Sequence, residues 1–140
     1  MRVLVTGGTG FLGGHIVGEL SAAGIEPIVF ARSSSDTTRL DALGIEVRRG
    51  AFDAPASLRK ACEGVDAVVH AAGGGVVKEV ADYYRDNTKS TEALLAAMPA
   101  GSRFMLISSL AAHGPARTAR PGFEGPVAFE EDPVRPTSHY

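Results

Sequence analysis

The 140-residue sequence has little cysteine, no long apolar run and little net charge, and each scarcity excludes a class of protein. Cys62 is the single cysteine, so an internal disulfide is impossible and a reducing compartment is favoured. No apolar run approaches the roughly 20 residues that span a bilayer, and the opening MRVLVTGG reaches glycine too early for a signal peptide. The formal charge of −2 gives no reason to expect nucleic acid or an anionic membrane as a partner. We therefore expect a cytoplasmic protein.

Short apolar runs alternate with helical patterns along most of the chain. The runs predict five buried strands, at residues 3–5, 28–30, 45–47, 67–69 and 104–107. The patterns between them predict helices at residues 11–23, 37–43, 56–61 and 80–97. This alternation indicates an α/β fold in which helices cover both faces of a parallel sheet.

The last 28 residues, 113–140, differ from the rest in composition. They hold five of the eight prolines and two of the four histidines, and they show no helical or alternating pattern. Structureless segments beyond about 12–15 residues are usually functional or disordered. We therefore expect two parts, a sheet region over residues 1–112 and a proline-rich functional loop over residues 113–140.

The strongest local motif is the stretch VLVTGGTGFLGGHIV, in which Gly7, Gly10 and Gly13 stand three apart between a strand and a helix. Glycines at a strand-to-helix turn let a pyrophosphate approach the backbone and let helix and strand pack closely. The N–H groups and partial positive charge at the start of the helix then favour phosphate. The motif predicts a dinucleotide-binding turn, with a tight turn that binds nothing as the alternative.

The Gly-x-x-Gly-x-x-Gly spacing resembles that of the extended short-chain dehydrogenase/reductase superfamily, the NAD(P)-dependent epimerase/dehydratase family. The stretches DAVVHAAG, YYRDNTKSTEALL, FMLISSLAAHG and RPTSHY are similar to later motifs of that family. The resemblance implies a Rossmann-like doubly wound parallel sheet, with five strands here in the order 3-2-1-4-5. It also implies NAD(P)-dependent hydride transfer at a carbonyl or hydroxyl of a small-molecule substrate such as a sugar nucleotide.

The same resemblance assigns residues that bind the cofactor. They are Gly7, Thr9, Gly10, Phe11, Leu12 and Gly13 at the glycine turn, Arg32 and Ser33 after the second strand, Phe52 after the third, and Ala71, Ala72 and Gly73 after the fourth.

The residues after the second strand predict NADP rather than NAD. Members that bind NAD carry an acidic residue at the position of Ala31, whereas here Arg32 follows directly. A carboxylate would repel a 2′-phosphate, and a guanidinium pairs with it through charge-assisted hydrogen bonds. We therefore expect NADP(H), with NAD as the alternative and Arg39 as a second candidate contact. Ala51 stands where the family has an aspartate for the adenine amino group, so that contact is in doubt.

The resemblance also assigns a catalytic set, namely Ser109, Tyr140 and Asn87, with Ser108 and Lys78 near the substrate. Tyr140 would exchange a proton with the substrate oxygen while Ser109 hydrogen-bonds the same oxygen. A free phenol has a pKa near 10, and the family lowers it with a lysine four residues later, which this sequence does not reach. Asn87 would help to hold the site together.

From this we expect an amino-terminal portion of a longer enzyme, inactive by itself, without its substrate domain and with a possible homodimer for the parent. A non-catalytic NAD(P)-binding sensor or scaffold of the same fold is the alternative. His70 is expected to be a core histidine whose hydrogen-bonding groups are satisfied.

Overall fold

The computed structural model describes residues 1–74, 79–116, 119 and 121–139. It divides into two compact units, Met1–Ile107 and Ser108–Tyr140, which are considered separately below. Within the described part of the chain, no helix has the length and apolar character needed to cross a membrane.

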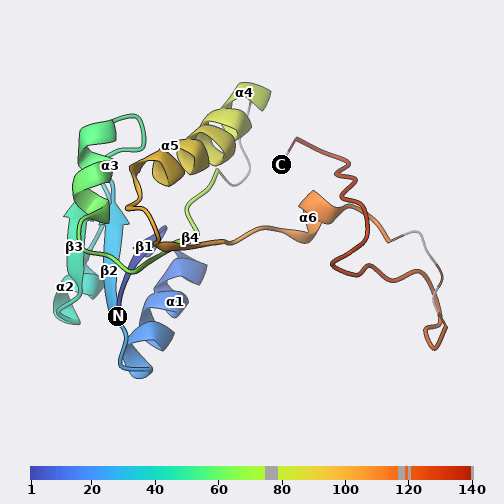
Figure 1. Cartoon of the computed structure of the whole chain (residues 1–140), viewed down its shortest axis with the longest axis horizontal. Helices are drawn as coiled ribbons and strands as arrows, with labels where there is room; N and C mark the ends of the chain where they lie inside the picture. Colours follow the sequence, from blue (N-terminus) through green and yellow to red (C-terminus); the bar gives the residue numbers. More distant parts are fainter. Residues whose placement is uncertain (75–78, 117–118, 120, 140) are drawn as a thin grey trace. The chain divides into compact units, whose positions relative to one another are not determined.

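The first unit alternates strands and helices, as the sequence predicts (Figure 1). Its elements are β1 (Arg2–Thr6), α1 (Phe11–Ala22), β2 (Glu26–Ala31), α2 (Thr38–Ala42), β3 (Glu46–Arg49), α3 (Pro55–Cys62), β4 (Ala67–His70), α4 (Val80–Tyr83), η1 (Tyr84–Lys89), α5 (Ser90–Ala97) and β5 (Arg103–Leu106).

The strands form one sheet in the order β3-β2-β1-β4-β5, and every pairing is parallel. In the centre of the sheet Leu4 of β1 lies between Ile28 of β2 and Val68 of β4. The predicted Rossmann-like fold and strand order are confirmed. Because all strands run the same way, their carboxyl ends share one edge, where ligands of open α/β sheets bind.

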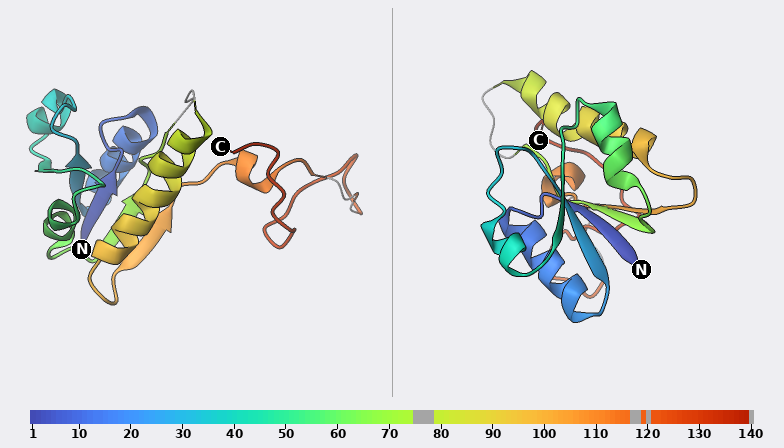
Figure 2. Two further views of the ribbon diagram at one scale, coloured as in Figure 1. Left: turned by 90° about the horizontal axis from the view of Figure 1, so that it is seen from above. Right: turned by 90° about the vertical axis from the view of Figure 1, so that its left-hand side faces the viewer.

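Alternating side chains of the strands build two cores, one on each face of the sheet. Leu4, Ile28 and Val68 face α3 and α5, where they pack with Leu58 and Leu94. The neighbouring strand positions face α1 and α2 on the other side, where Val17 and Leu40 complete the second core. Figure 2 shows these two helical layers, with the sheet between them.

The predicted helix over residues 80–97 is present, but its middle is the π-helical segment η1. Two hydroxyls bond main-chain carbonyls at this place: Ser90 Oγ donates to the Asp86 oxygen at 2.6 Å, and Thr91 Oγ1 to the Asn87 oxygen at 2.6 Å. Serine and threonine that bond back to the preceding turn disturb the regular ladder. π-Helical turns are rare and frequently mark functional sites.

The second unit has little regular structure among its described residues, and it begins with a short helix that the sequence did not predict. This helix is α6 (Leu110–His113), and Ser109 caps it by accepting a hydrogen bond from the Ala111 N–H at 3.1 Å. Gly114 follows at φ 81°, and a side chain there would meet the Arg135 carbonyl. An antiparallel bridge joins Ala119 to Pro126.

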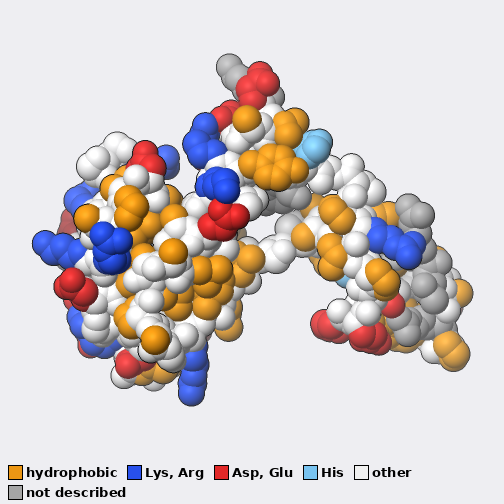
Figure 3. Space-filling view, turned by 45° about the horizontal axis from the view of Figure 1, so that its top comes forward, with side chains coloured by type: hydrophobic (Ala, Val, Ile, Leu, Met, Phe, Trp, Pro, Cys, Tyr) orange, Lys and Arg blue, Asp and Glu red, His pale blue; other side chains and the backbone are white. Residues whose placement is uncertain are grey.

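Charged side chains of both signs are interspersed with apolar ones on the face of the first unit seen in Figure 3. Several of the charges form ion pairs at the amino end of the sheet. Arg2 pairs with Glu26 at 2.9 Å and with Glu46 at 2.8 Å, and Arg48 pairs with Glu46 at 2.7 Å. These pairs join β1, β2 and β3 at the edge opposite to the carboxyl ends.

Candidate functional site

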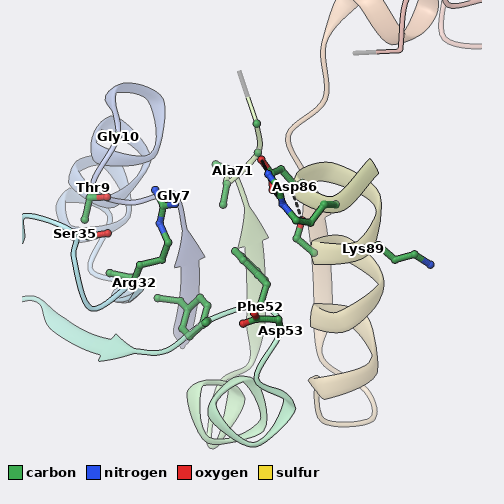
Figure 4. A pocket seen from close by; sticks show the side chains of 18 residues that line it. Gly7, Thr9, Gly10, Arg32, Ser35, Phe52, Asp53, Ala71, Asp86 and Lys89 are labelled. Atoms are coloured by element: carbon green, nitrogen blue, oxygen red, sulfur yellow. Dashed lines mark hydrogen bonds and ion pairs between the residues drawn. The ribbon is translucent and has the colours of Figure 1, made fainter. Parts of the chain in front are cut away.

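A cavity of about 690 Å³ lies at the carboxyl ends of the strands; we call it the strand-end cavity (Figure 4). Its volume lies within the range of pockets that hold small molecules and cofactors. It is lined by Gly7, Thr9, Gly10, Phe30, Ala31, Arg32, Ser35, Ala51, Phe52, Asp53, Ala71, Ala72, Gly73, Gly74, Arg85, Asp86, Lys89 and Ser90.

The glycine turn between β1 and α1 forms one wall of the cavity. Gly7 has φ 73°, and a Cβ there would lie 2.7 Å from the Ala71 carbonyl oxygen. At Gly13 a Cβ would lie 2.1 Å from the Gly7 carbonyl oxygen. Both contacts are with backbone, which cannot yield as a flexible side chain can. Only glycine therefore allows this close approach of α1, the turn and the end of β4.

The start of α1 leaves N–H groups without helical partners. The first helical hydrogen bond runs from the Gly14 N–H to the Gly10 carbonyl at 2.9 Å. The N–H groups of Phe11, Leu12 and Gly13 precede this bond and have no intrahelical acceptor. Gly10 provides no side-chain cap. Such an end, on a helix of twelve residues, is suited to an anionic group.

A buried hydrogen-bond chain links β1 to the end of β4. The Ala72 N–H donates to Thr6 Oγ1 at 3.1 Å, and Thr6 Oγ1 lies 2.6 Å from His70 Nδ1. A hydroxyl has one proton and two lone pairs, so Thr6 can accept from the Ala72 amide and either donate to Nδ1 or accept from it, according to the His70 tautomer. Within the described residues, Nε2 has no hydrogen-bond partner.

His70 is 1% exposed, so it is a core histidine as predicted, but among the described residues only its Nδ1 has a hydrogen-bond partner. Its ring lies between those of Phe52 and Phe104, with centroid distances of 5.6 and 6.2 Å. Burial lowers the pKa of His70 from 6.5 to about 4, because the charged imidazolium loses its hydration. The imidazole is therefore neutral at neutral pH.

The floor of the cavity comes from the segment after β3. Phe52 makes an edge contact with Phe30, at a centroid distance of 5.4 Å. Ala51 and Asp53 flank it and also line the cavity. Ala51 has no carboxylate, so Asp53 is the acidic residue that this segment contributes to the cavity lining.

Three basic residues line the cavity, and two of them are neutralised by acids. Arg85 pairs with Asp82 and, at 2.7 Å, with Asp86, and the hydrogen bonds that its guanidinium donates to Asp86 and Asp82 raise its pKa. Lys89 pairs with Glu92 at 2.8 Å and points away from the cavity (Figure 4). For Arg32, the described residues provide no ion pair, and its side chain extends toward the glycine turn in this view.

Asn87 fixes the loop after β4. Its Oδ1 accepts a hydrogen bond from the Gly74 N–H at 2.9 Å. A Cβ at Gly73 would lie 2.8 Å from the same oxygen, so the loop passes directly over the amide. Asn87 therefore holds the cavity wall, and its predicted catalytic role stays a prediction.

The structure brings together eight of the twelve residues predicted to bind the cofactor. Phe11, Leu12, Gly13 and Ser33 are outside the lining, and the Phe11 side chain is 86% exposed. Ser108 and Ser109 are exposed and belong to the second unit. Lys78 and Tyr140 lie outside the described residues, so the proposed catalytic set remains a prediction.

Sequence reasoning missed several residues around the cavity. Ser35 lines it in place of Ser33, and Arg85, Asp86, Lys89 and Ser90 line it from η1 and α5. The resemblance already placed YYRDNTKSTEALL at this helix, but which of its side chains face the cavity depends on the π-helical register.

Comparison with known proteins assigns the chain to a family. The family model for the NAD dependent epimerase/dehydratase family matches residues 3–140. The chain belongs to this family. The predicted relationship to the extended short-chain dehydrogenases and reductases is confirmed.

Its relatives include both reductases and epimerases. The chain is 36% identical to a ceramide reductase of Caulobacter vibrioides over 114 residues, which are 81% of this chain and 36% of the relative. It is 36% identical to a UDP-glucose 4-epimerase of Azospirillum brasilense over 118 residues, 79% of this chain and 34% of the relative. The chain thus spans about a third of the length of these curated relatives.

A solved structure agrees with the fold. The UDP-glucose 4-epimerase of Brucella ovis in complex with NAD superimposes with a TM-score of 0.81 at 28% identity. The match covers 99% of this chain and 43% of that chain.

Proposed function

We propose that the strand-end cavity binds NADP(H), and that this chain provides the cofactor-binding part of an enzyme that transfers hydride. The observation that carries the coenzyme choice is Arg32, which lines the cavity directly after Ala31 and has no ion pair among the described residues. An unpaired guanidinium beside a cavity binds the 2′-phosphate of NADP strongly through charge-assisted hydrogen bonds. The 2′-hydroxyl of NAD instead needs an acceptor such as a carboxylate.

The residues present fit a dinucleotide. Side chains at Gly7 or Gly13 would collide with the backbone of the turn, so the glycines keep open the close backbone approach that a pyrophosphate needs. The free N–H groups at the start of α1 would hold its oxygens. Phe52, Ala51 and Asp53 would bound the adenine, and Ala71 to Gly73 would leave room for the nicotinamide ribose.

The bound cofactor would supply hydride transfer, and the chain's residues would supply orientation and proton transfer. Ser109 and Tyr140 are proposed to hydrogen-bond the substrate oxygen and to exchange its proton. The ceramide reductase and the UDP-glucose 4-epimerase among the relatives both support a substrate with a carbonyl or hydroxyl group. A sugar nucleotide is one such substrate.

NAD is the second candidate, because the family is described as NAD dependent and the Brucella ovis epimerase was solved with NAD. Asp36 does not favour it, because its Oδ1 accepts hydrogen bonds from the Thr38 N–H and hydroxyl, at 2.9 and 2.7 Å. This carboxylate therefore serves the start of α2.

Calorimetric titration with NADPH and NADH tests the proposal. The chain should bind NADPH at least about tenfold more tightly, and Arg32→Ala should weaken NADPH binding by about 1.5–3 kcal/mol while NADH binding changes little. Arg59→Ala removes an equal charge from α3, outside the cavity lining, and should change the affinity for neither NADPH nor NADH. Equal affinities for both coenzymes in the unmodified chain would refute the choice of NADP(H).

A further inference from the structure

Arg49, the last residue of β3, reaches across to the loop that follows β2. Its Nη1 lies 3.1 Å from the carbonyl oxygens of Arg32 and Ser33, and 3.4 Å from that of Ser35. Three main-chain carbonyls of one loop thus converge on a single guanidinium nitrogen. A pattern in the sequence does not predict this contact, because Arg49 is a charged residue at a strand end, 17 positions from Arg32.

The second nitrogen of the same guanidinium continues the contact. Arg49 Nη2 donates to Thr37 Oγ1 at 2.8 Å, and Thr37 Oγ1 donates to Asp41 Oδ2 at 3.0 Å. Thr37 is 5% exposed, so its hydroxyl is a buried link between the cation and the carboxylate. Arg49 therefore spans the loop from its first residue, Arg32, to its last, Thr37.

We propose that Arg49 is a positioning residue for coenzyme specificity. It folds the loop from Arg32 to Thr37 so that the Arg32 guanidinium and the Ser35 hydroxyl meet the 2′-phosphate, without touching the phosphate itself. This inference rests on the proposed binding of NADP(H) in the strand-end cavity.

The loop has few other internal contacts that would keep this shape. The Ser35 N–H donates to the Arg32 carbonyl at 3.0 Å, which makes one turn, and at the far end the Thr38 N–H donates to Asp36 Oδ1. Without Arg49, the Ser33 and Ser35 carbonyls would lose their guanidinium donor, and the Arg32 carbonyl would keep only the Ser35 N–H. Water would hydrate these exposed carbonyls, so the link between the three peptides would be lost and the loop would open.

An opened loop would move Arg32 in particular. Its carbonyl is held by both the Ser35 N–H and Arg49, so the direction of its side chain depends on that peptide's orientation. A shift of about 1 Å is enough to disturb a positioned contact. The proposed adenosine and pyrophosphate contacts would come from the glycine turn and from Phe52, to which Arg49 donates no hydrogen bond, so they would persist.

Lysine is the informative substitution at this position. It keeps the charge but loses the planar guanidinium. Arg49 reaches three carbonyls with one nitrogen and a hydroxyl with the other, whereas a lysine ammonium has one nitrogen and cannot reach all four groups. Arg48→Lys is the matched control, since Arg48 precedes Arg49 on β3 and donates instead to the carbonyls of Ala61 and Glu63, at 2.7 and 2.8 Å. Both substitutions leave the net charge unchanged.

The probes are adenosine 2′,5′-bisphosphate and AMP, which differ only in the 2′-phosphate and need no nicotinamide site. We expect Arg49→Lys to weaken binding of the bisphosphate at least about fivefold and binding of AMP less than about twofold. Arg48→Lys should change neither by more than about twofold. Equal losses for both ligands with Arg49→Lys, or no loss, would overturn the inference, because a residue that only supports the fold changes both together.

Arg32→Ala in the same titration separates this inference from the proposed function. If Arg32→Ala weakens the bisphosphate selectively and Arg49→Lys does not, Arg49 has no positioning role and the binding of NADP(H) stands. If Arg32→Ala has no selective effect, the 2′-phosphate does not bind there, and both proposals fail.

Discussion

Replacing Gly13 by alanine tests whether the glycine turn is built for close packing. The added methyl would lie 2.1 Å from the Gly7 carbonyl oxygen, 2.5 Å from its carbon and 2.9 Å from the Gly8 nitrogen. All three are backbone atoms at the centre of the turn, so relief requires α1 to move away from β1. That motion would also displace the N–H groups at the start of α1.

The cost follows from overpacking. Extra methyl groups in a tightly packed place typically cost 1–3 kcal/mol, and a collision with backbone belongs at the upper end of this range. We expect a loss of about 2–3 kcal/mol, which corresponds to a fall of roughly 10 °C in Tm for a unit of this size. Dinucleotide affinity should fall by at least about tenfold, since the phosphate-binding N–H groups move.

Gly18→Ala is the matched control, because Gly18 lies on the same helix with no atom within 4 Å of an added Cβ. Alanine is favoured over glycine in a helix by about 0.5–1 kcal/mol, so this variant should be slightly more stable. Thermal unfolding followed by circular dichroism, and titration with NADPH, measure both effects. A Gly13→Ala protein with unchanged Tm and affinity would refute the packing argument.

Two further predictions concern His70, at the end of β4, and Asn87, which holds the loop after β4. Lowering the pH from about 6.5 to about 4 should reduce the free energy of unfolding by up to about 3 kcal/mol, because the unfolded chain protonates its histidine near 6.5 while the folded His70 pKa is about 4. Urea unfolding at each pH measures this, and His70→Gln should lose that part of the slope; an unchanged slope would contradict it. Asn87→Ala should speed amide hydrogen exchange at Gly74 and cost about 1 kcal/mol, whereas Asn87→Asp keeps an acceptor and should preserve the protection. Equal hydrogen-exchange rates of the Gly74 amide in the two Asn87 variants would show that the Asn87 side chain does not hold this loop.

The sequence was sufficient for the sheet because its signals are local. Apolar runs such as Ile28 to Phe30, each followed by a helical pattern, define strand and crossover, and the chain then has few ways to pack them. The glycine turn was equally readable, since Gly7 and Gly13 are needed for backbone geometry, whatever the rest of the molecule does.

The parts that the sequence did not reveal depend on contacts between distant segments or on small changes of register. Arg49 contacts the loop after β2 only because β2 and β3 are paired in the sheet. Ser35 lines the cavity in place of Ser33 because a hydrogen bond from the Ser35 N–H to the Arg32 carbonyl turns the chain there. Asp86 lines the cavity from η1, whose register a pattern of apolar residues does not specify. The α6 helix has four residues, too few to show a periodic pattern.

The central claim is that the strand-end cavity holds a dinucleotide, and mapping of the binding surface tests it most directly. Backbone amide chemical shifts of the 140-residue chain would be followed by NMR during titration with NADPH. The account predicts saturable changes at Gly7 to Gly14, at Arg32 to Ser35, at Phe52 and at Ala71 to Gly74, with little change at the amino ends of the strands. Saturation with no changes at the glycine turn, or no saturable change anywhere, would contradict it.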